Sequence, residues 1–157
     1  MKTQKIRLNF DSEPDPIQIG LVRLAKEIPD FELFYQINAL NTFQFTRIKD
    51  FVLRGTYFDH SFARFEGYHT DSKICIHFIS NKSIRSVQKK LANELFSGEE
   101  ECRFLLPNSP EVDYVIKTSE PFDDFSLILH PENLMFKIQS FMLNPSEELY
   151  QSFQYYE

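Results

Sequence analysis

Two alternating segments joined by a short polar turn constrain the fold of this chain most strongly. Residues 61–69 and 73–81 flank Thr70-Asp71-Ser72, a connection of the kind that joins antiparallel strands. The second segment is apolar at both of its alternating sets, Ile74, Ile76 and Phe78 on one side and Cys75, His77 and Ile79 on the other. The sequence therefore predicts a central strand that is covered on both faces of its sheet.

Hydrophobic spacing predicts the remaining elements. Further strands are expected at residues 17–24, 102–106 and 112–118, and a short helix at residues 122–129. Longer helices are expected at residues 31–41, from the cap Ser83 to Gly98, and from the cap Asn144 onward. Residues 42–53 and 134–142 fit either a strand or a helix. Together these elements predict an α+β fold, with a mostly antiparallel sheet and three to four helices packed on it.

The chain is expected to form a single domain over residues 1–157, because its length fits one domain and no linker or repeat divides it. The acidic, proline-containing run at residues 11–16 separates residues 1–16 as a loose N-terminal arm. No apolar run approaches the roughly 20 residues of a membrane span, and no secretory signal is recognisable. The two cysteines, Cys75 and Cys102, suit a reducing compartment, so a soluble cytoplasmic protein is expected.

The formal charge of −6 is unevenly distributed along the chain. Residues 1–90 hold 14 Lys and Arg against 10 Asp and Glu, whereas residues 91–157 hold 3 against 13. This acidic part favours a partner protein with a basic surface, although the acids could equally form a solvated face. Binding to nucleic acid is not expected, because the densest basic stretch, residues 82–90, has no interleaved aromatic residues.

The sequence contains no motif for catalysis, metal or cofactor. Its four glycines are too scattered for a phosphate-binding loop, and no Gly-x-Ser-x-Gly, His-Glu-x-x-His or Cys-x-x-Cys pattern occurs. His69 and His77 could meet across the hairpin, but a histidine on a sheet face is more often a packing group. No catalytic residue, metal ligand or cofactor is predicted, and the question of an enzyme stays open with a leaning to no.

Residues 106–114 (LPNSPEVDY), called here the two-proline segment, predict a turn that enters a strand. Pro107 and Pro110 each fix a φ angle and lack an amide donor, so the first half of the segment must turn. Asp113 stands at the start of a strand, where an aspartate is unfavourable unless it has a partner. Two interpretations stay open: Asp113 accepts amide hydrogen bonds near the turn, or it binds a ligand.

The two-proline segment resembles the naming pattern of the IPExxxVDY family. The matching residues are Pro107, Val112, Asp113 and Tyr114; Leu106 stands for isoleucine, and Asn108 replaces the glutamate. Residues 79–82 (Ile-Ser-Asn-Lys) and 30–38 also resemble segments of that family. The resemblance implies a small protein of the Bacteroidota and implies no activity, cofactor or ligand.

These observations favour a non-enzymatic module that binds another protein or helps to assemble a complex, with its oligomeric state left open. Tyr150, Phe153 and Tyr156 lie near the end of the chain, where termini are often free to engage a partner, or they pack on the chain's own core. The alternative function is a small-molecule-binding domain or an enzyme that uses a pocket near Asp113 and Tyr114.

Overall fold

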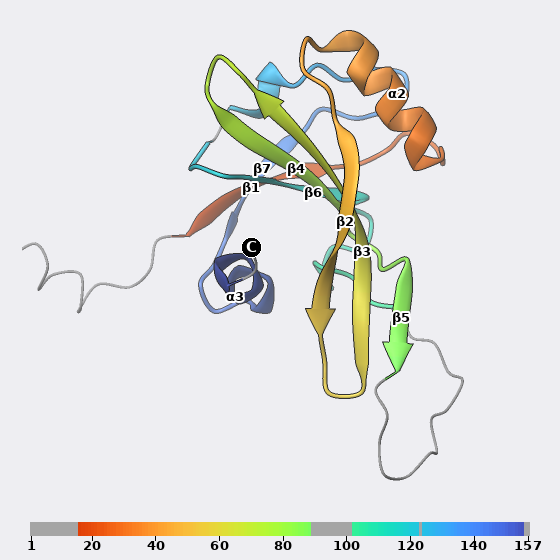
Figure 1. Cartoon of the computed structure of the whole chain (residues 1–157), viewed down its shortest axis with the longest axis vertical. Coiled ribbons are helices and arrows are strands. Elements are labelled where there is room, and N and C mark those ends of the chain that lie inside the picture. Colours follow the sequence, from red (N-terminus) through yellow and green to blue (C-terminus); the bar gives the residue numbers. More distant parts are fainter. Residues whose placement is uncertain (1–15, 89–101, 123, 156–157) are drawn as a thin grey trace, which may run out of the picture.

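A computed structural model describes residues 16–88, 102–122 and 124–155. In these parts of the chain, seven strands form one antiparallel sheet in the order β2-β3-β4-β6-β1-β7, and β5 pairs with β3 (Figure 1). The elements are β1 (Ile17–Val22), α2 (Asp30–Leu40), β2 (Thr46–Arg54), β3 (Phe58–His69), β4 (Ile74–Ser80), β5 (Arg85–Gln88), β6 (Tyr114–Thr118), the 3-10 turn η1 (Phe125–Leu127), β7 (Gln139–Leu143) and α3 (Glu148–Tyr155).

The long strand β3 organises one half of the sheet. One of its edges pairs with β2, and its other edge is shared by two strands. Residues 64–69 pair with β4, whereas residues 58–61 extend past β4 and pair with β5. In Figure 1 this extension reaches downward with β2 and β5 on either side of it. The extension therefore has its backbone hydrogen-bonding groups occupied on both edges.

The sheet is covered on both faces, and a separate core lies under each cover. Helix α2 buries Leu33, Phe34 and Ile37 against one face, where the ring of Phe34 stacks on that of Phe65 with centroids 3.9 Å apart. Helix α3 covers the other face with Leu149, Tyr150 and Phe153. Figure 1 shows the two helices on opposite sides of the sheet.

The hairpin prediction is confirmed. Strand β4 lies between β3 and β6, with Ile76 and Phe78 buried in the core under α2 and Ile79 buried in the core under α3. The predicted strand at residues 17–24 and the predicted helix at residues 31–41 correspond to β1 and α2. The ambiguous residues 42–53 contribute to β2, a strand.

The predicted fold class is wrong in its helices, since two α-helices pack on the sheet within the described residues in place of three to four. The helix expected from Ser83 begins instead with β5, and Ile84 and Val87 are about half exposed rather than buried on a helical stripe. The reason is tertiary: the free edge of β3 at residues 58–61 pairs with this segment, and the pairing overrides helix propensity. Residues 89–101, the rest of that predicted helix, lie outside the described residues.

Three smaller predictions also need correction. Residues 102–106 form only a single bridge, between Phe104 and Lys82, and the described residues of 122–129 form only the short turn η1. Helix α3 begins at Glu148 and not directly after Asn144. The expected N-terminal arm, apart from Pro16, and Tyr156 lie outside the described residues.

In the described part of the chain, neither helix has the length and apolar character needed to cross a membrane.

Candidate functional site

The side chain of Asn81, the residue that directly follows β4, makes three hydrogen bonds to the backbone of the two-proline segment. Asn81 is fully buried, and its Nδ2 donates to the carbonyl oxygens of Ser109 at 3.0 Å and Val112 at 2.9 Å. Its Oδ1 accepts the N–H of Leu106 at 2.8 Å. A buried amide that satisfies three backbone groups fixes both ends of the segment, because each group would be costly to leave unpaired.

Asp113 connects this segment to the end of strand β1. One carboxylate oxygen accepts the N–H of Leu24 at 2.7 Å, and the backbone N–H of Asp113 donates to the carbonyl oxygen of Val22 at 2.7 Å. Partial burial raises the pKa of the Asp113 carboxyl, while the Leu24 hydrogen bond and the nearby Arg23 act in the opposite direction. Asp113 thus accepts a backbone N–H, but the donor, Leu24, lies 89 residues away in the segment just after β1 rather than in the turn.

The side chain of Tyr114, the next residue, points away from that of Asp113 and packs in the core beneath α2. Its ring meets the ring of Phe34 edge-on, with centroids 5.7 Å apart. Burial, followed by the negative charges of Asp30 and Asp113, raises the pKa of the Tyr114 hydroxyl well above its ordinary value. The hydroxyl is therefore a neutral group at physiological pH.

A cavity of about 360 Å³ lies beside these two residues and is called the Asp113 cavity below. Its wall has an apolar part formed by Leu24, Ile28, Phe104, Pro110, Val112 and Tyr114. Its polar part is formed by Lys26, Glu27, Ser80, Lys82 and Asp113. Both charge signs and an apolar surface therefore meet in one concave site, which is typical of small-molecule pockets.

Tyr150 and Phe153, the described members of the predicted C-terminal aromatic set, do not line this cavity. Tyr150 and Phe153 are buried in the core on the α3 face, where the ring of Phe153 meets that of Phe51 edge-on at 5.6 Å. The ammonium group of Lys117 lies over the same Phe153 ring, 5.6 Å from its centroid. Of the site residues predicted from the sequence, Asp113 and Tyr114 lie together, whereas Tyr150 and Phe153 are core residues of α3.

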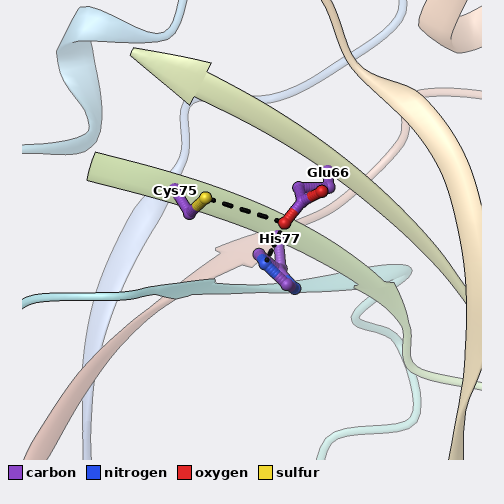
Figure 2. Close-up of side chains that lie close together, drawn as sticks. All are labelled: Glu66, Cys75 and His77. Atoms are coloured by element: carbon purple, nitrogen blue, oxygen red, sulfur yellow. Dashed lines mark hydrogen bonds and ion pairs between the residues drawn. The ribbon is translucent and has the colours of Figure 1, made fainter. Parts of the chain in front are cut away.

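Sequence reasoning missed a polar cluster on β3 and β4 (Figure 2). The Oε2 atom of Glu66 lies 3.2 Å from Nε2 of His77 and 3.6 Å from Sγ of Cys75. Burial, together with Arg64 and Lys117, lowers the pKa of His77 against the opposing effect of Glu66. Burial and the charge of Glu66 raise the pKa of the Cys75 thiol.

His69, the histidine expected near His77, lies on the other face of the sheet. It pairs with Ile74 across the hairpin and packs its ring edge-on against Phe43, at 5.2 Å, in the core under α2. His77 is instead directly opposite Glu66. The two histidines are therefore kept apart by the sheet itself.

Comparison of the chain with protein-family models, with curated proteins and with solved structures found no match in any of the three. The resemblance to the IPExxxVDY family stays a prediction. The geometry of the described residues is thus the basis for proposing a function.

Proposed function

We propose that this chain is a small-molecule-binding domain whose binding site is the Asp113 cavity. The observation that carries the proposal is the meeting of Lys82, Asp113 and an apolar wall in one cavity. Its volume of about 360 Å³ lies within the range of pockets that hold small ligands. A carboxyl group whose pKa is raised by burial at such a cavity is itself typical of a functional site.

The lining chemistry supports a particular class of ligand. Lys26 and Lys82 are donors for an anionic group, and Asp113 is an acceptor for a cationic or other donor group. Ile28, Phe104 and Val112 offer apolar contact. A small zwitterion with an apolar body, such as an amino acid, satisfies all three parts of the wall.

Three related probes test the proposal by NMR titration of the ¹⁵N-labelled chain. L-phenylalanine carries both charges, phenylacetate carries only the anion, and phenethylamine carries only the cation. Saturable shifts are expected at the backbone amides of Leu24, Val112 and Tyr114, with L-phenylalanine binding most tightly. Asp113→Asn should weaken L-phenylalanine and phenethylamine by about tenfold or more, as expected for a lost charge-assisted hydrogen bond, and leave phenylacetate unchanged.

Asp71→Asn is the matched control, because Asp71 is an exposed carboxylate in the β3–β4 turn. It should leave all three affinities at their original values. The proposal fails if none of the probes gives saturable shifts at the cavity, or if Asp113→Asn and Asp71→Asn behave alike.

A second candidate function, a protein-binding module, is favoured by a different feature. A broad groove of about 1200 Å³ runs between the end of α2 and residues 124–140. Three large apolar side chains at this groove are well exposed, namely Leu40 at 45%, Leu129 at 53% and Phe136 at 57%. Because residues 91–157 are strongly acidic, the partner we propose for this groove is a protein with a basic surface.

The double variant Leu129→Ser/Phe136→Ser tests this second candidate in a native co-purification. Its control is Phe31→Ser/Tyr35→Ser, which removes two aromatic residues of α2 that are still more exposed, at 75% each, and do not line the groove. A basic protein that is lost only with the groove variant, and that rebinds the purified chain in a one-to-one complex, supports the candidate. Identical partner sets for both variants count against it.

A further inference from the structure

We propose that Glu66, Cys75 and His77 form a binding site for one transition-metal ion of the zinc type. The site is distinct from the Asp113 cavity, since none of its three residues lines that cavity. Carboxylate, thiolate and imidazole are all established zinc ligands.

Two adjacent interior strands of the sheet, β3 and β4, position the three side chains on one face. Glu66 of β3 and His77 of β4 are directly paired, so their side chains rise on the same side of the sheet. Cys75 lies two residues before His77 on β4 and therefore points to the same side. Figure 2 shows the three side chains converging from these adjacent strands. Because β4 is a central strand, the backbone that carries the ligands is held on both edges.

The distances between the potential ligand atoms fit tetrahedral coordination. Zinc bonds of about 2.0–2.3 Å place neighbouring ligand atoms about 3.3–3.7 Å apart in a tetrahedron. The separation of Glu66 Oε2 from His77 Nε2 is 3.2 Å, and that of Glu66 Oε2 from Cys75 Sγ is 3.6 Å. All three ligand atoms lie within 4.8 Å of one another, so small side-chain rotations complete the triangle.

The ligand set selects the kind of ion. A thiolate beside an imidazole favours Zn²⁺ or Co²⁺ over Mg²⁺ and Ca²⁺, which prefer oxygen ligands. A divalent ion bound by one thiolate and one carboxylate forms a group with no net charge. Binding releases the thiol proton of Cys75 to solvent, so the cluster changes from the single negative charge of Glu66 to zero. Arg64 and Lys117, which both act on His77, therefore face no net positive charge after the ion binds.

The cluster is accessible from solvent. The side chain of Glu66 is 39% exposed and that of His77 is 19% exposed, so an ion can enter with a bound water. Three protein ligands with water in the fourth position are the arrangement of catalytic zinc sites, whereas structural sites close with four protein ligands. We therefore assign the cluster as an open metal site.

Titration with Co²⁺ tests the site directly, using untagged chain kept reduced by a phosphine so that no competing thiol is present. One ion per chain is expected, with the charge-transfer absorption that a cysteine thiolate gives when it binds cobalt. Cys75→Ser should abolish this absorption and weaken Co²⁺ binding by about 100-fold or more. Loss of a direct ligand should cost at least as much affinity as loss of a residue that only hydrogen-bonds to a ligand, which costs up to about 100-fold. Cys102→Ser, which alters the exposed second cysteine, should change neither.

A second pair of variants keeps the test valid if Cys75→Ser perturbs folding. Glu66→Gln preserves the side-chain shape and should weaken Co²⁺ by about tenfold or more with the thiolate absorption retained. His69→Gln, on the other face of the hairpin, should bind like the unaltered chain. Absence of saturation at one ion per chain overturns the proposal, as does thiolate absorption that survives Cys75→Ser or a Glu66→Gln affinity equal to that of His69→Gln.

Discussion

The side-chain nitrogen of Asn81 lies 2.9 Å from the carbonyl oxygen of Val112, a residue 31 positions later in the chain. This contact joins the end of β4 to the two-proline segment, directly before Asp113. The adjoining Tyr114 in turn packs on Phe34 of α2. The three segments that carry the resemblance to the IPExxxVDY family are far apart in the sequence but contact one another through residues 106–114. Of these segments, only 79–82 and 106–114 contribute residues that line the Asp113 cavity.

Asn81→Ala should destabilise the fold strongly, because it removes the partners of the backbone groups of Leu106, Ser109 and Val112. With about 1–3 kcal/mol for each buried group left unpaired, the free energy of unfolding should fall by about 3 kcal/mol or more. Urea denaturation measures the change. Asn108→Ala, at an exposed position of the same segment, should cost little, and a comparable loss in the two variants would contradict the role of Asn81.

Phe153→Ala should reduce the free energy of unfolding by about 3–5 kcal/mol, the usual cost of truncating a buried phenylalanine. Phe136→Ala, at a position that is 57% exposed, is the matched control and should cost far less. Thermal or urea unfolding of both variants decides whether the C-terminal aromatic residues act in the core. A Phe153 variant as stable as the original chain would show that they do not.

Asp113→Asn should change the dependence of stability on pH in a definite direction. The pKa of Asp113 is raised in the folded chain, so its contribution to stability is present below the unfolded pKa and is lost as pH rises through the folded pKa. Asparagine keeps an acceptor for the N–H of Leu24 and carries no charge. The variant should therefore gain stability relative to the original chain as pH rises through and above 3.8, the ordinary value for aspartate.

Denaturation of both chains at a series of pH values measures this difference. If the stability gained by the variant is the same at every pH, the hydrogen bond to the charged carboxylate balances its desolvation. If that gain falls as pH rises, the hydrogen bond outweighs the desolvation, and either result contradicts the prediction. If Asp113→Asn is as stable as expected at neutral pH, the fold does not need the charge. The charge is then available for a ligand.

The hairpin shows both how far sequence reasoning reaches and where it stops. The alternation of side chains along the sequence identifies β3 and β4, because a pattern of period two is a local signal. Apolar residues in both alternating sets of β4 likewise indicate that β4 is buried on both faces. The register in which β3 and β4 pair depends on the turn that joins them. Lys73 adopts a φ of 59° and belongs to the connection, so His69 pairs with Ile74 and Glu66 with His77.

Treating Lys73 as the first strand residue shifts the pairing by one position and moves the partner side chains to the other face. In the shifted register Glu66 stands opposite Ile76 in place of His77, which conceals the Glu66–Cys75–His77 cluster and places His69 and His77 on the same face of the hairpin. A left-handed lysine is uncommon, so the sequence gives little warning of it.

The segment after Ser83 illustrates a second limit. Its local pattern fits a helix, but the hydroxyl of Ser83 accepts the N–H of Arg103 and the following residues pair with β3. The strand forms because an edge of β3 that lies 24 to 30 residues earlier is available for pairing, and no local pattern reveals that edge. The N–H that Asp113 accepts is likewise not apparent from local sequence, since Leu24 lies 89 residues earlier, just beyond the end of β1. The pocket near Asp113 and Tyr114 that the sequence offers as an alternative corresponds to the Asp113 cavity, and its role in binding stays a prediction.

The most direct test of the central claim is to locate a bound probe by intermolecular NOEs between L-phenylalanine and the methyl groups of the labelled chain. Binding in the Asp113 cavity predicts NOEs from the probe ring to the methyls of Leu24, Ile28 and Val112. NOEs confined to Ile128, Leu129 and Ile138, which line the broad groove, would contradict it.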